Sequence, residues 1–377
     1  MLFKSVIGQD ELKQQLRQAV QEGRTAHAQL FWGNSGYGSL PLALALAQYI
    51  NCTNRTGDDA CGCCPSCHKM QKLIHPDLHF AVPVNSTKKV PDKEKPVTDH
   101  FLARWREAVL ANPYLNEQEW YEAIDIENKQ GNISVNEAAR IMEKLHFKPF
   151  EAEYKVMIIW LPERMNMQTS NRLLKLIEEP PTKTLFFLVS EDTTRIIKTI
   201  QSRAQPVYVP PIDEEALVKI KMERDGVPET QARKQARAAA GSYSKLLSGT
   251  ANDADTTEYF ASFTSLMRLA YIVDGMALMA WAEELAKTGR EYQKSFLTYA
   301  EQLLRESFMN NRQVPEVTYL LGDEAAFVQK FSPYVNERNV EAIYNTFNLA
   351  TMHLAQNGNV KIIFTDMAMQ LAQWVRA

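Results

Sequence analysis

One stretch near the N-terminus restricts the folds open to this chain more than any other. An apolar run at 28–32 leads into a turn that contains Gly33, Gly36 and Gly38, and an apolar helical stretch at 40–50 follows. A strand, a glycine-rich turn and a helix in this order present free backbone N–H groups at a helix N-terminus, where they can hold phosphate oxygens. The stretch therefore predicts the scaffold of a nucleotide site.

This turn lacks the two side chains that a working phosphate-binding loop needs. The active motif reads Gly-x-x-x-x-Gly-Lys-Ser/Thr, and Gly33 and Gly38 have the required spacing. Ser39 stands at the lysine position, and Leu40 stands at the position of the hydroxyl that binds Mg²⁺. Losing one charge-assisted contact of this kind costs ~1.5–3 kcal/mol. We therefore expect no productive ATP binding in this chain.

A later apolar run, 155–160, predicts a buried strand that shows the same loss on the metal-binding side. In an ATPase of this layout the strand ends in two carboxylates, one for Mg²⁺ and one that orients water. Trp160 and Leu161 occupy these positions here. Glu163 comes two residues further on and is expected to point elsewhere, so the strand is predicted to serve the core alone.

All five cysteines of the chain lie between Cys52 and Cys67. Four thiolates in a tetrahedron suit zinc, and Cys-x2-Cys turns commonly present them. We predict a structural zinc site of Cys52, Cys61, Cys64 and Cys67, with Cys63 as a spare that could replace Cys64. A redox-active thiol pair or unpaired reactive thiols are the alternatives. Four thiolates leave no open coordination position, which favours a structural role over a catalytic one.

Length and composition indicate a globular protein of two or three domains. The chain has 377 residues, of which 45% are hydrophobic and 23% charged, and its net charge is −3. No overall basic field therefore draws it to nucleic acid. The N-terminus is polar within a few residues, and no apolar run approaches the ~18 residues of a membrane span. These features predict a cytoplasmic protein without a membrane segment.

Strands and helices are expected to alternate as far as residue 208, which predicts a parallel sheet with helices on both faces. Further strands are predicted at 78–82, near 123–126 and at 184–190. Helices are predicted at 10–23 with Asp10 as cap, at 135–146 behind a Ser134–Glu137 capping box, and at 171–179 before Pro180 and Pro181. The prolines at 210–211 mark a boundary, and helical periodicity dominates both 213–248 and 255–377.

The segment 84–122 interrupts this alternation. Residues 84–97 are polar and contain prolines, so they predict a surface loop, and 98–122 predicts a helix and a turn. The lysines at 88, 89, 93 and 95 can reach a phosphate backbone, although a solvated loop is the better interpretation.

Taken together, these pieces resemble the bacterial clamp-loader subunits of the DNA polymerase III holoenzyme, which are AAA+ proteins, and among them the delta-prime type. The resemblance covers roughly the first 250 residues. The matching stretches are Ile7-Gly8-Gln9, residues 25–31, the loop 33–40, the four cysteines, His75-Pro76-Asp77, residues 173–181 and Ser202-Arg203-Ala204.

The resemblance implies three domains and a place in a five-subunit ring. It implies a RecA-like domain at 1–209 with its zinc module at 52–67, a helical lid at 210–250 and a helical collar at 251–377. The implied partners are gamma/tau and delta subunits, the sliding clamp and primed DNA. Such a subunit is an accessory part of the polymerase complex and does not hydrolyse ATP itself.

The family's Ser-Arg-Cys motif supplies an arginine finger to the ATP site of a neighbouring subunit. The motif reads Ser202-Arg203-Ala204 here, so Arg203 is expected to act in trans, with a surface salt bridge as the alternative. A lid arginine that senses nucleotide in such ATPases is replaced by Ser244. The insertion at 84–122 departs from the family, and its role stays open.

Two other functions compete with this interpretation. An active gamma/tau-like ATPase would need a lysine and an acidic pair that the sequence does not offer. A zinc-containing nucleic-acid-binding protein outside replication would fit the cysteines, but the net charge and the sheet-plus-lid layout argue against it.

Overall fold

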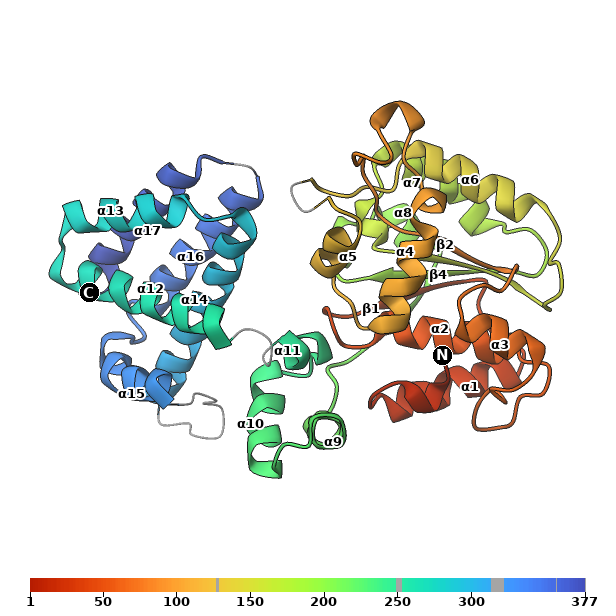
Figure 1. Cartoon of the computed structure of the whole chain (residues 1–377), viewed down its shortest axis with the longest axis horizontal. Coiled ribbons are helices and arrows are strands. Elements are labelled where there is room, and N and C mark those ends of the chain that lie inside the picture. Colours follow the sequence, from red (N-terminus) through yellow and green to blue (C-terminus); the bar gives the residue numbers. More distant parts are fainter. Residues whose placement is uncertain (127–128, 249–252, 313–321, 357, 377) are drawn as a thin grey trace. The chain divides into compact units, whose positions relative to one another are not determined.

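The computed structural model describes residues 1–377 apart from 127–128, 249–252, 313–321, 357 and 377. The chain forms two compact units, Met1–Ser248 and Gly249–Ala377 (Figure 1). The first unit contains the sheet and the second is helical. This confirms the predicted class, an α/β N-terminal region followed by an all-α region.

In the described part of the first unit, a parallel sheet runs in the order β2-β3-β4-β1-β5. Parallel strands need crossover connections, and helices supply them here. The strands are β1 (Ala28–Trp32), β2 (Leu78–Ala81), β3 (Lys155–Trp160), β4 (Thr184–Ser190) and β5 (Gln205–Tyr208). The central strands β3 and β4 are buried along their whole length, as expected for a sheet that is covered on both faces.

Successive strand side chains enter two separate cores, one on each face of the sheet. Val156, Ile158 and Trp160 of β3 join the first core, whereas Met157 and Ile159 join the second. Helices α1 (Asp10–Gln21), α2 (Ser39–Ile50), α3 (Pro65–Gln71), α4 (Thr98–Ala111) and α5 (Glu117–Ala123) border the first core. Helices α6 (Val135–His146), α7 (Met167–Glu178) and α8 (Lys198–Gln201) border the second (Figure 1). The predicted two-sided cover is therefore confirmed.

The predicted strand near 123–126 is wrong. Ala123 is the last residue of α5, and Asp125 turns the backbone with a φ of 61°. Ile124 and Ile126 are buried against the first core, which explains their apolar character without a strand. Short apolar runs do not distinguish a strand from a buried turn by periodicity alone.

Two predicted helix caps and the predicted surface loop also differ from the structure. Ser134 precedes α6, but its side chain makes no cap bond, and Glu137 instead accepts the Thr98 N–H across the fold. Asp10 is the first residue of α1 and not its cap. Residues 84–97 are only partly a surface loop, because Val84, Ser86 and Val97 are buried.

Three further helices close the first unit: α9 (Glu214–Asp225), α10 (Glu229–Ala239) and α11 (Tyr243–Ser248). They share a small core built on Leu217, Ala232 and Leu246. Tyr114, which lies between α4 and α5, belongs to the same core. We call α9–α11 the lid helices.

The second unit packs its helices around a dense aromatic core. Phe263, Phe296, Phe347 and Phe364 are completely buried there. The helices are α12 (Asp253–Ile272), α13 (Gly275–Ala286), α14 (Arg290–Asn311), α15 (Gly322–Phe331), α16 (Val340–Ala355) and α17 (Val360–Trp374). Among the described residues, no helix is both long and apolar enough to cross a bilayer.

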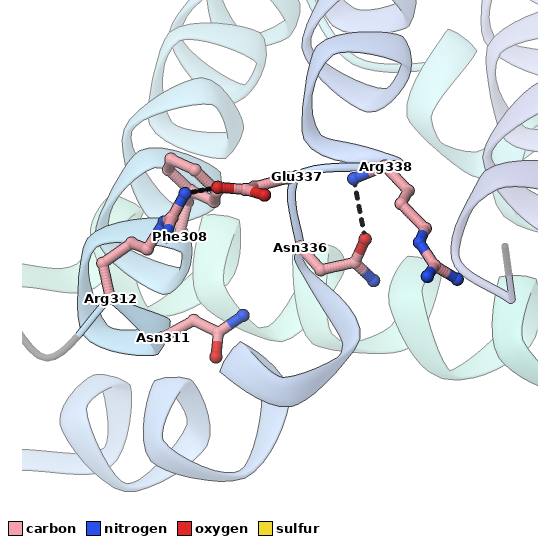
Figure 2. Close-up of a pocket in the computed structure, with 6 residues that line it drawn as sticks. All are labelled: Phe308, Asn311, Arg312, Asn336, Glu337 and Arg338. Atoms are coloured by element: carbon pink, nitrogen blue, oxygen red, sulfur yellow. Dashed lines mark hydrogen bonds and ion pairs between the residues drawn. The ribbon is translucent and has the colours of Figure 1, made fainter.

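A polar cavity of about 390 Å³ opens on the second unit, between the end of α14 and residues 336–338 (Figure 2). Arg312 and Glu337 form an ion pair across it, and the Arg338 N–H donates to Asn336. Its lining is thus already engaged in internal contacts.

Candidate functional site

The glycine-rich turn at the carboxyl end of β1 has the backbone of a phosphate-binding loop. Gly36 and Gly38 have φ angles of 80° and 103°, which favour glycine strongly. Helix α2 begins directly afterwards at Ser39, and Pro41 lies in its first turn, where its missing N–H costs nothing. The turn therefore has the backbone conformation of such a loop, with Ser39 and Leu40 at the positions of the lysine and the hydroxyl of the active motif.

The pocket inside this turn is almost full. Its volume is about 20 Å³, which is room for about one water molecule. The lining comes from residues 33–41, from Pro113–Leu115 of the insertion, and from Trp160 and Glu191. A nucleotide cannot enter a pocket of this volume unless the lining moves.

Trp160 fills the side of the pocket where metal-binding carboxylates are found in an ATPase. Its ring is 2% exposed and packs against Trp105, which in turn meets Trp120 edge-on, with 5.1 Å between ring centroids in each pair. Leu161 is also buried. The Ser39 hydroxyl is buried without a hydrogen-bond partner among the described residues. These groups offer no charge to a phosphate or to Mg²⁺.

Glu163 does not replace the missing carboxylates in this pocket, because it supports the loop after β4. Its carboxylate accepts the N–H groups of Glu191 and Asp192, at 2.9 and 3.2 Å. Burial raises the pKa of the Glu191 carboxyl to about 7, and Glu163 and Glu117 add repulsion. A separate cavity of about 210 Å³ lies beside this loop, between Trp32 and Tyr208.

Tyr114, which the sequence did not single out, is the other main occupant of the pocket. It is 4% exposed and lies in the short connection between α4 and α5. The signal that could have found it is the apolar pair Tyr114 and Leu115 between two polar asparagines at 112 and 116. That pattern marks a buried residue but does not say what it is buried against.

Arg203 lies just after α8 at the edge of the sheet where β4 and β5 begin. Its Nε is 2.9 Å from a carboxylate oxygen of Glu178, the last residue of α7. Its Nη1 donates to the Thr199 carbonyl at 3.0 Å. The Arg203 side chain is 33% exposed and that of Glu178 is 50% exposed. The guanidinium is thus held at the surface by one ion pair, and it does not approach the chain's own P-loop pocket.

The cysteines predicted as metal ligands come together. The sulfur atoms of Cys52, Cys61, Cys64 and Cys67 lie within 4.8 Å of one another, and those of Cys61 and Cys67 are 3.9 Å apart. Zinc with Zn–S bonds of about 2.3 Å places its sulfurs about 3.8 Å apart, so the cluster fits a tetrahedral ion. Cys63 is exposed and lies outside this cluster.

Backbone N–H donors favour the thiolate in part of this cluster, whereas burial raises the pKa of the Cys52 and Cys67 thiols. The N–H groups of residues 61, 64 and 67 donate to the sulfurs of Cys52, Cys61 and Cys64, at 3.3 to 3.4 Å. The N–H groups of Cys63 and Cys64 lower the pKa of the Cys61 thiol. A metal ion requires deprotonated sulfur, so these donors prepare the site.

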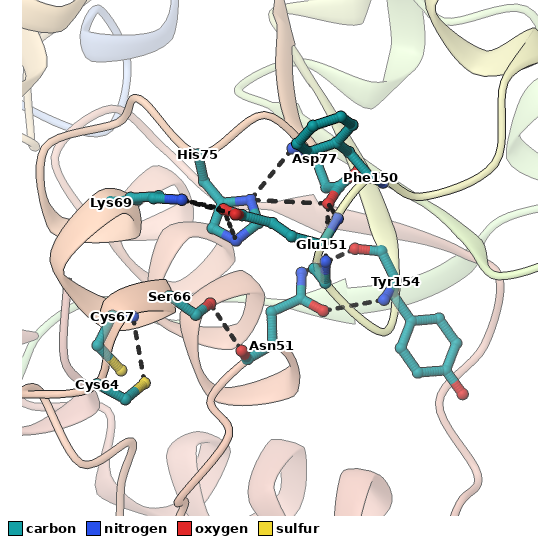
Figure 3. A network of polar contacts seen from close by, with 11 residues as sticks. Asn51, Cys64, Ser66, Cys67, Lys69, His75, Asp77, Phe150, Glu151 and Tyr154 are labelled. Carbon is teal, nitrogen blue, oxygen red and sulfur yellow. Dashed lines mark hydrogen bonds and ion pairs between the residues drawn. The ribbon is translucent and has the colours of Figure 1, made fainter.

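A polar network attaches this cysteine module to the sheet (Figure 3). Ser66 donates to the Asn51 carbonyl, and the Asn51 side chain makes two hydrogen bonds with the backbone of Tyr154. Lys69 pairs with Glu151, whose carboxylate is 3.4 Å from His75 Nε2. The module is therefore held against the segment that leads into β3.

Asp77 holds the centre of that network. Its carboxylate accepts the N–H groups of Phe150, Glu151 and Ala152, at 2.6, 2.9 and 2.8 Å. His75 Nδ1 accepts the Asp77 N–H at 3.1 Å, which orients the ring. The predicted family stretch His75-Pro76-Asp77 is thus a structural joint between β2 and β3.

The fold and the site together define an α/β protein of the AAA+ class with a small pocket at its glycine-rich turn. The family model described as DNA polymerase III, delta subunit, matches residues 8–213, which is more than half of the chain. The chain belongs to this family, as a clamp-loader subunit of the delta-prime type.

Individual relatives agree with this assignment. The delta-prime subunit of DNA polymerase III from Escherichia coli is 22% identical over 94% of this chain and 92% of its own length. The delta-prime subunit from Haemophilus influenzae is 29% identical, over 51% of this chain and 45% of the relative.

A solved gamma subunit-related protein from Thermotoga maritima aligns with 97% of this chain and 100% of its own chain, at 15% identity. Its TM-score is 0.38.

Proposed function

We propose that this chain is a non-hydrolysing subunit of the replicative clamp loader, which helps to load the sliding clamp onto primed DNA. The observation that carries the proposal is the pocket volume of about 20 Å³ at the P-loop. A subunit whose nucleotide pocket is closed by its own side chains contributes to the ring as a structural wall.

The chemistry of the pocket supports the same function. No lysine occurs between Lys13 and Lys69, so none can replace the missing P-loop lysine locally. Trp160 and Leu161 remove the carboxylates that would hold Mg²⁺ and orient water. The gamma/tau-like ATPase function is therefore disfavoured on both the phosphate and the metal side.

Arg203 is the residue through which this chain acts on a neighbour. A planar guanidinium stabilises the charge that develops on a transferred γ-phosphate, and it does so across a subunit interface. The half-exposed pair with Glu178 supports this role, because an exposed ion pair contributes only ~0–1 kcal/mol and is readily exchanged for a phosphate. In this proposal Glu178 orients the arginine until the ring assembles.

The cysteine module is proposed to hold one structural Zn²⁺ through Cys52, Cys61, Cys64 and Cys67. The sulfur spacing and the N–H donors support it. When bound, the ion would stabilise the loop between α2 and α3, and the polar network of Figure 3 would transmit that order to β3.

The wider arrangement follows from the family. We propose a RecA-like domain at 1–209, a lid at 210–250 and a collar at 251–377. The proposed partners are gamma/tau and delta subunits in a cytoplasmic hetero-pentamer. Relatives of this chain carry the names gamma, tau and delta-prime, which supports the gamma/tau partners. The delta partner follows from the resemblance to clamp-loader subunits.

Two measurements test the proposal. Calorimetry of the isolated chain with ATP and Mg²⁺ should detect no binding, and micromolar affinity that depends on Mg²⁺ would refute the closed pocket. Mixing the chain with gamma/tau and delta homologues should give a stable pentamer by size-exclusion chromatography with light scattering. Failure to assemble would favour a zinc-containing protein outside replication.

A further inference from the structure

We propose that the inserted segment around Tyr114 is a permanent internal occupant of the P-loop pocket, and that it fastens the lid helices to the sheet. This goes beyond the proposed function, because it concerns the chain alone and needs no partner subunit. It also assigns a role to part of the insertion at 84–122.

Tyr114 contacts the glycine-rich turn on one side. A Cβ atom added to Gly38 would lie 3.3 Å from the Tyr114 ring, so the ring packs directly against the turn. The Ile7 backbone N–H donates to the Tyr114 hydroxyl at 2.7 Å. The Tyr114 ring therefore packs against the turn, and its hydroxyl accepts a hydrogen bond from the N-terminal segment.

Tyr114 contacts the lid helices on its other side. The Tyr114 and Tyr243 rings meet edge-on, with centroids 4.8 Å apart. The Ser244 hydroxyl donates to the Tyr114 carbonyl. Tyr114 also lies in the small core that holds the lid helices together. One residue thus joins the P-loop, the N-terminal segment and the lid.

The lid also contacts the turn directly, so the arrangement leaves little freedom. The Tyr243 N–H donates to the Gly36 carbonyl at 3.0 Å, and the Ser242 hydroxyl donates to the Ser35 carbonyl at 2.8 Å. A Cβ atom on Gly36 would lie 2.3 Å from the Ser242 hydroxyl oxygen. The lid is therefore in close contact with the loop that would otherwise surround phosphates.

The segment that presents Tyr114 is itself preorganised. The Asn112 side chain accepts the Tyr114 N–H at 3.0 Å just after α4 ends. Asn116 and Glu119 form a reciprocal capping box at the start of α5. An ion pair between Glu117 and Arg164 ties α5 to the short turn 162–164 that follows β3. Because both flanks are fixed, little conformational entropy opposes the Tyr114 contacts.

A nucleotide bound between a P-loop and a lid would contact both parts. The position of the lid would then depend on whether the nucleotide is bound. Tyr114 makes such a two-sided contact permanently. The lid of this chain is therefore expected to keep one position in all nucleotide conditions, which suits a subunit that serves as a fixed wall.

Hydrogen exchange of the full-length chain, read by mass spectrometry, tests this inference. Tyr114→Ala should speed exchange at least tenfold in two places, the lid residues 239–248 and the turn at 34–38. Tyr114→Phe keeps the ring and loses only the bond from Ile7, so its lid should exchange within about threefold of the wild type.

Tyr49→Ala is the matched control, since Tyr49 is completely buried and hydrogen-bonded but lies away from the pocket. It should leave lid exchange near the wild-type rate. Unchanged lid exchange in Tyr114→Ala, or an equal rise in Tyr49→Ala, would overturn the inference.

A second variant covers the case in which Tyr114→Ala fails to fold. Ser244→Ala removes the lid's hydrogen bond to the Tyr114 carbonyl and leaves the buried ring in place. It should speed exchange in the lid selectively, by about threefold or more, while the strands stay protected. Equal exchange in the lids of Ser244→Ala and wild type would also overturn the inference.

Discussion

Replacing Asp77 by Asn removes the charge at the joint between the cysteine module and the sheet. The carboxylate accepts the N–H groups of Phe150, Glu151 and Ala152 and is 1% exposed. Hydrogen bonds to a charged acceptor contribute about 1.5–3 kcal/mol each, and neutral ones about 0.5–1.5. The Asn amide presents one acceptor oxygen and turns an NH₂ group towards another donor.

The expected loss combines these terms. One hydrogen bond is lost and the others fall to neutral strength, while the smaller desolvation of a neutral side chain offsets part of the loss. The free energy of unfolding should fall by about 2–4 kcal/mol at pH 7. Urea unfolding followed by circular dichroism measures it, with hydrogen exchange at residues 150–154 as the local readout. Asp58→Asn, at an exposed position of the same module, is the matched control.

The pH dependence gives an independent check. Burial by itself raises the pKa of Asp77, but the N–H donors outweigh it and hold the pKa below its usual range. A carboxyl with a lowered folded pKa contributes stability that is present above its unfolded pKa and is lost as the pH falls through its folded pKa. The difference in the free energy of unfolding between wild type and Asp77→Asn should therefore be constant above about pH 5 and shrink below about pH 4. A gap at pH 7 no larger than that of Asp58→Asn would refute the reasoning.

Three further predictions concern other parts of the first unit. Arg203→Ala should lower the ATPase rate of the reconstituted ring while this chain stays folded. An arginine finger raises the hydrolysis rate on the order of 10³–10⁵-fold at the one site that it serves, so the fall in the total rate of the ring should be smaller. Arg203→Lys should not restore the rate. An unchanged rate at saturating clamp and DNA would refute the finger. Cys52→Ser should abolish the zinc content measured by atomic absorption, whereas Cys63→Ser should retain it. Equal zinc in the two variants would contradict the four-cysteine site. Glu191→Gln should raise the melting temperature at pH 8 but not at pH 5. The pKa of Glu191 is raised to about 7 in the folded state. The folded state therefore loses stability, on the order of 1–3 kcal/mol, as the pH rises from about 4.5 to 7. A variant that melts like the wild type at pH 8 would contradict the cost of charging Glu191.

Local patterns predicted much of the fold because they report local physics. Apolar runs at 28–32, 155–160 and 184–190 became β1, β3 and β4, since continuous apolar sequence suits strands buried on both faces. The strand predicted near 123–126 was wrong because a buried turn contains the same kind of apolar residues as a strand. The Ser134–Glu137 pattern failed because Glu137 found a long-range partner, the Thr98 N–H, in place of the local one.

The sequence by itself determined which side chains of an active phosphate-binding motif are missing from the glycine-rich turn. Ser39 and Leu40 at the start of α2 and Trp160 at the end of β3 stand where an active site has its lysine and metal ligands, whatever the fold does around them. The cysteine spacing likewise predicted the cluster that the structure forms, because Cys-x2-Cys turns close over short range.

Only the tertiary structure decided which side chain packs against the glycine-rich turn. Tyr114 reaches the turn at Gly38 and the N–H of Ile7 across 76 and 107 positions of sequence, and no local pattern encodes such contacts. The pairing of Arg203 with Glu178 is decided in the same way, by where α7 and α8 end relative to the sheet. Side-chain chemistry is local and can be read along the chain, whereas the occupant of a pocket depends on the path of every segment that passes it.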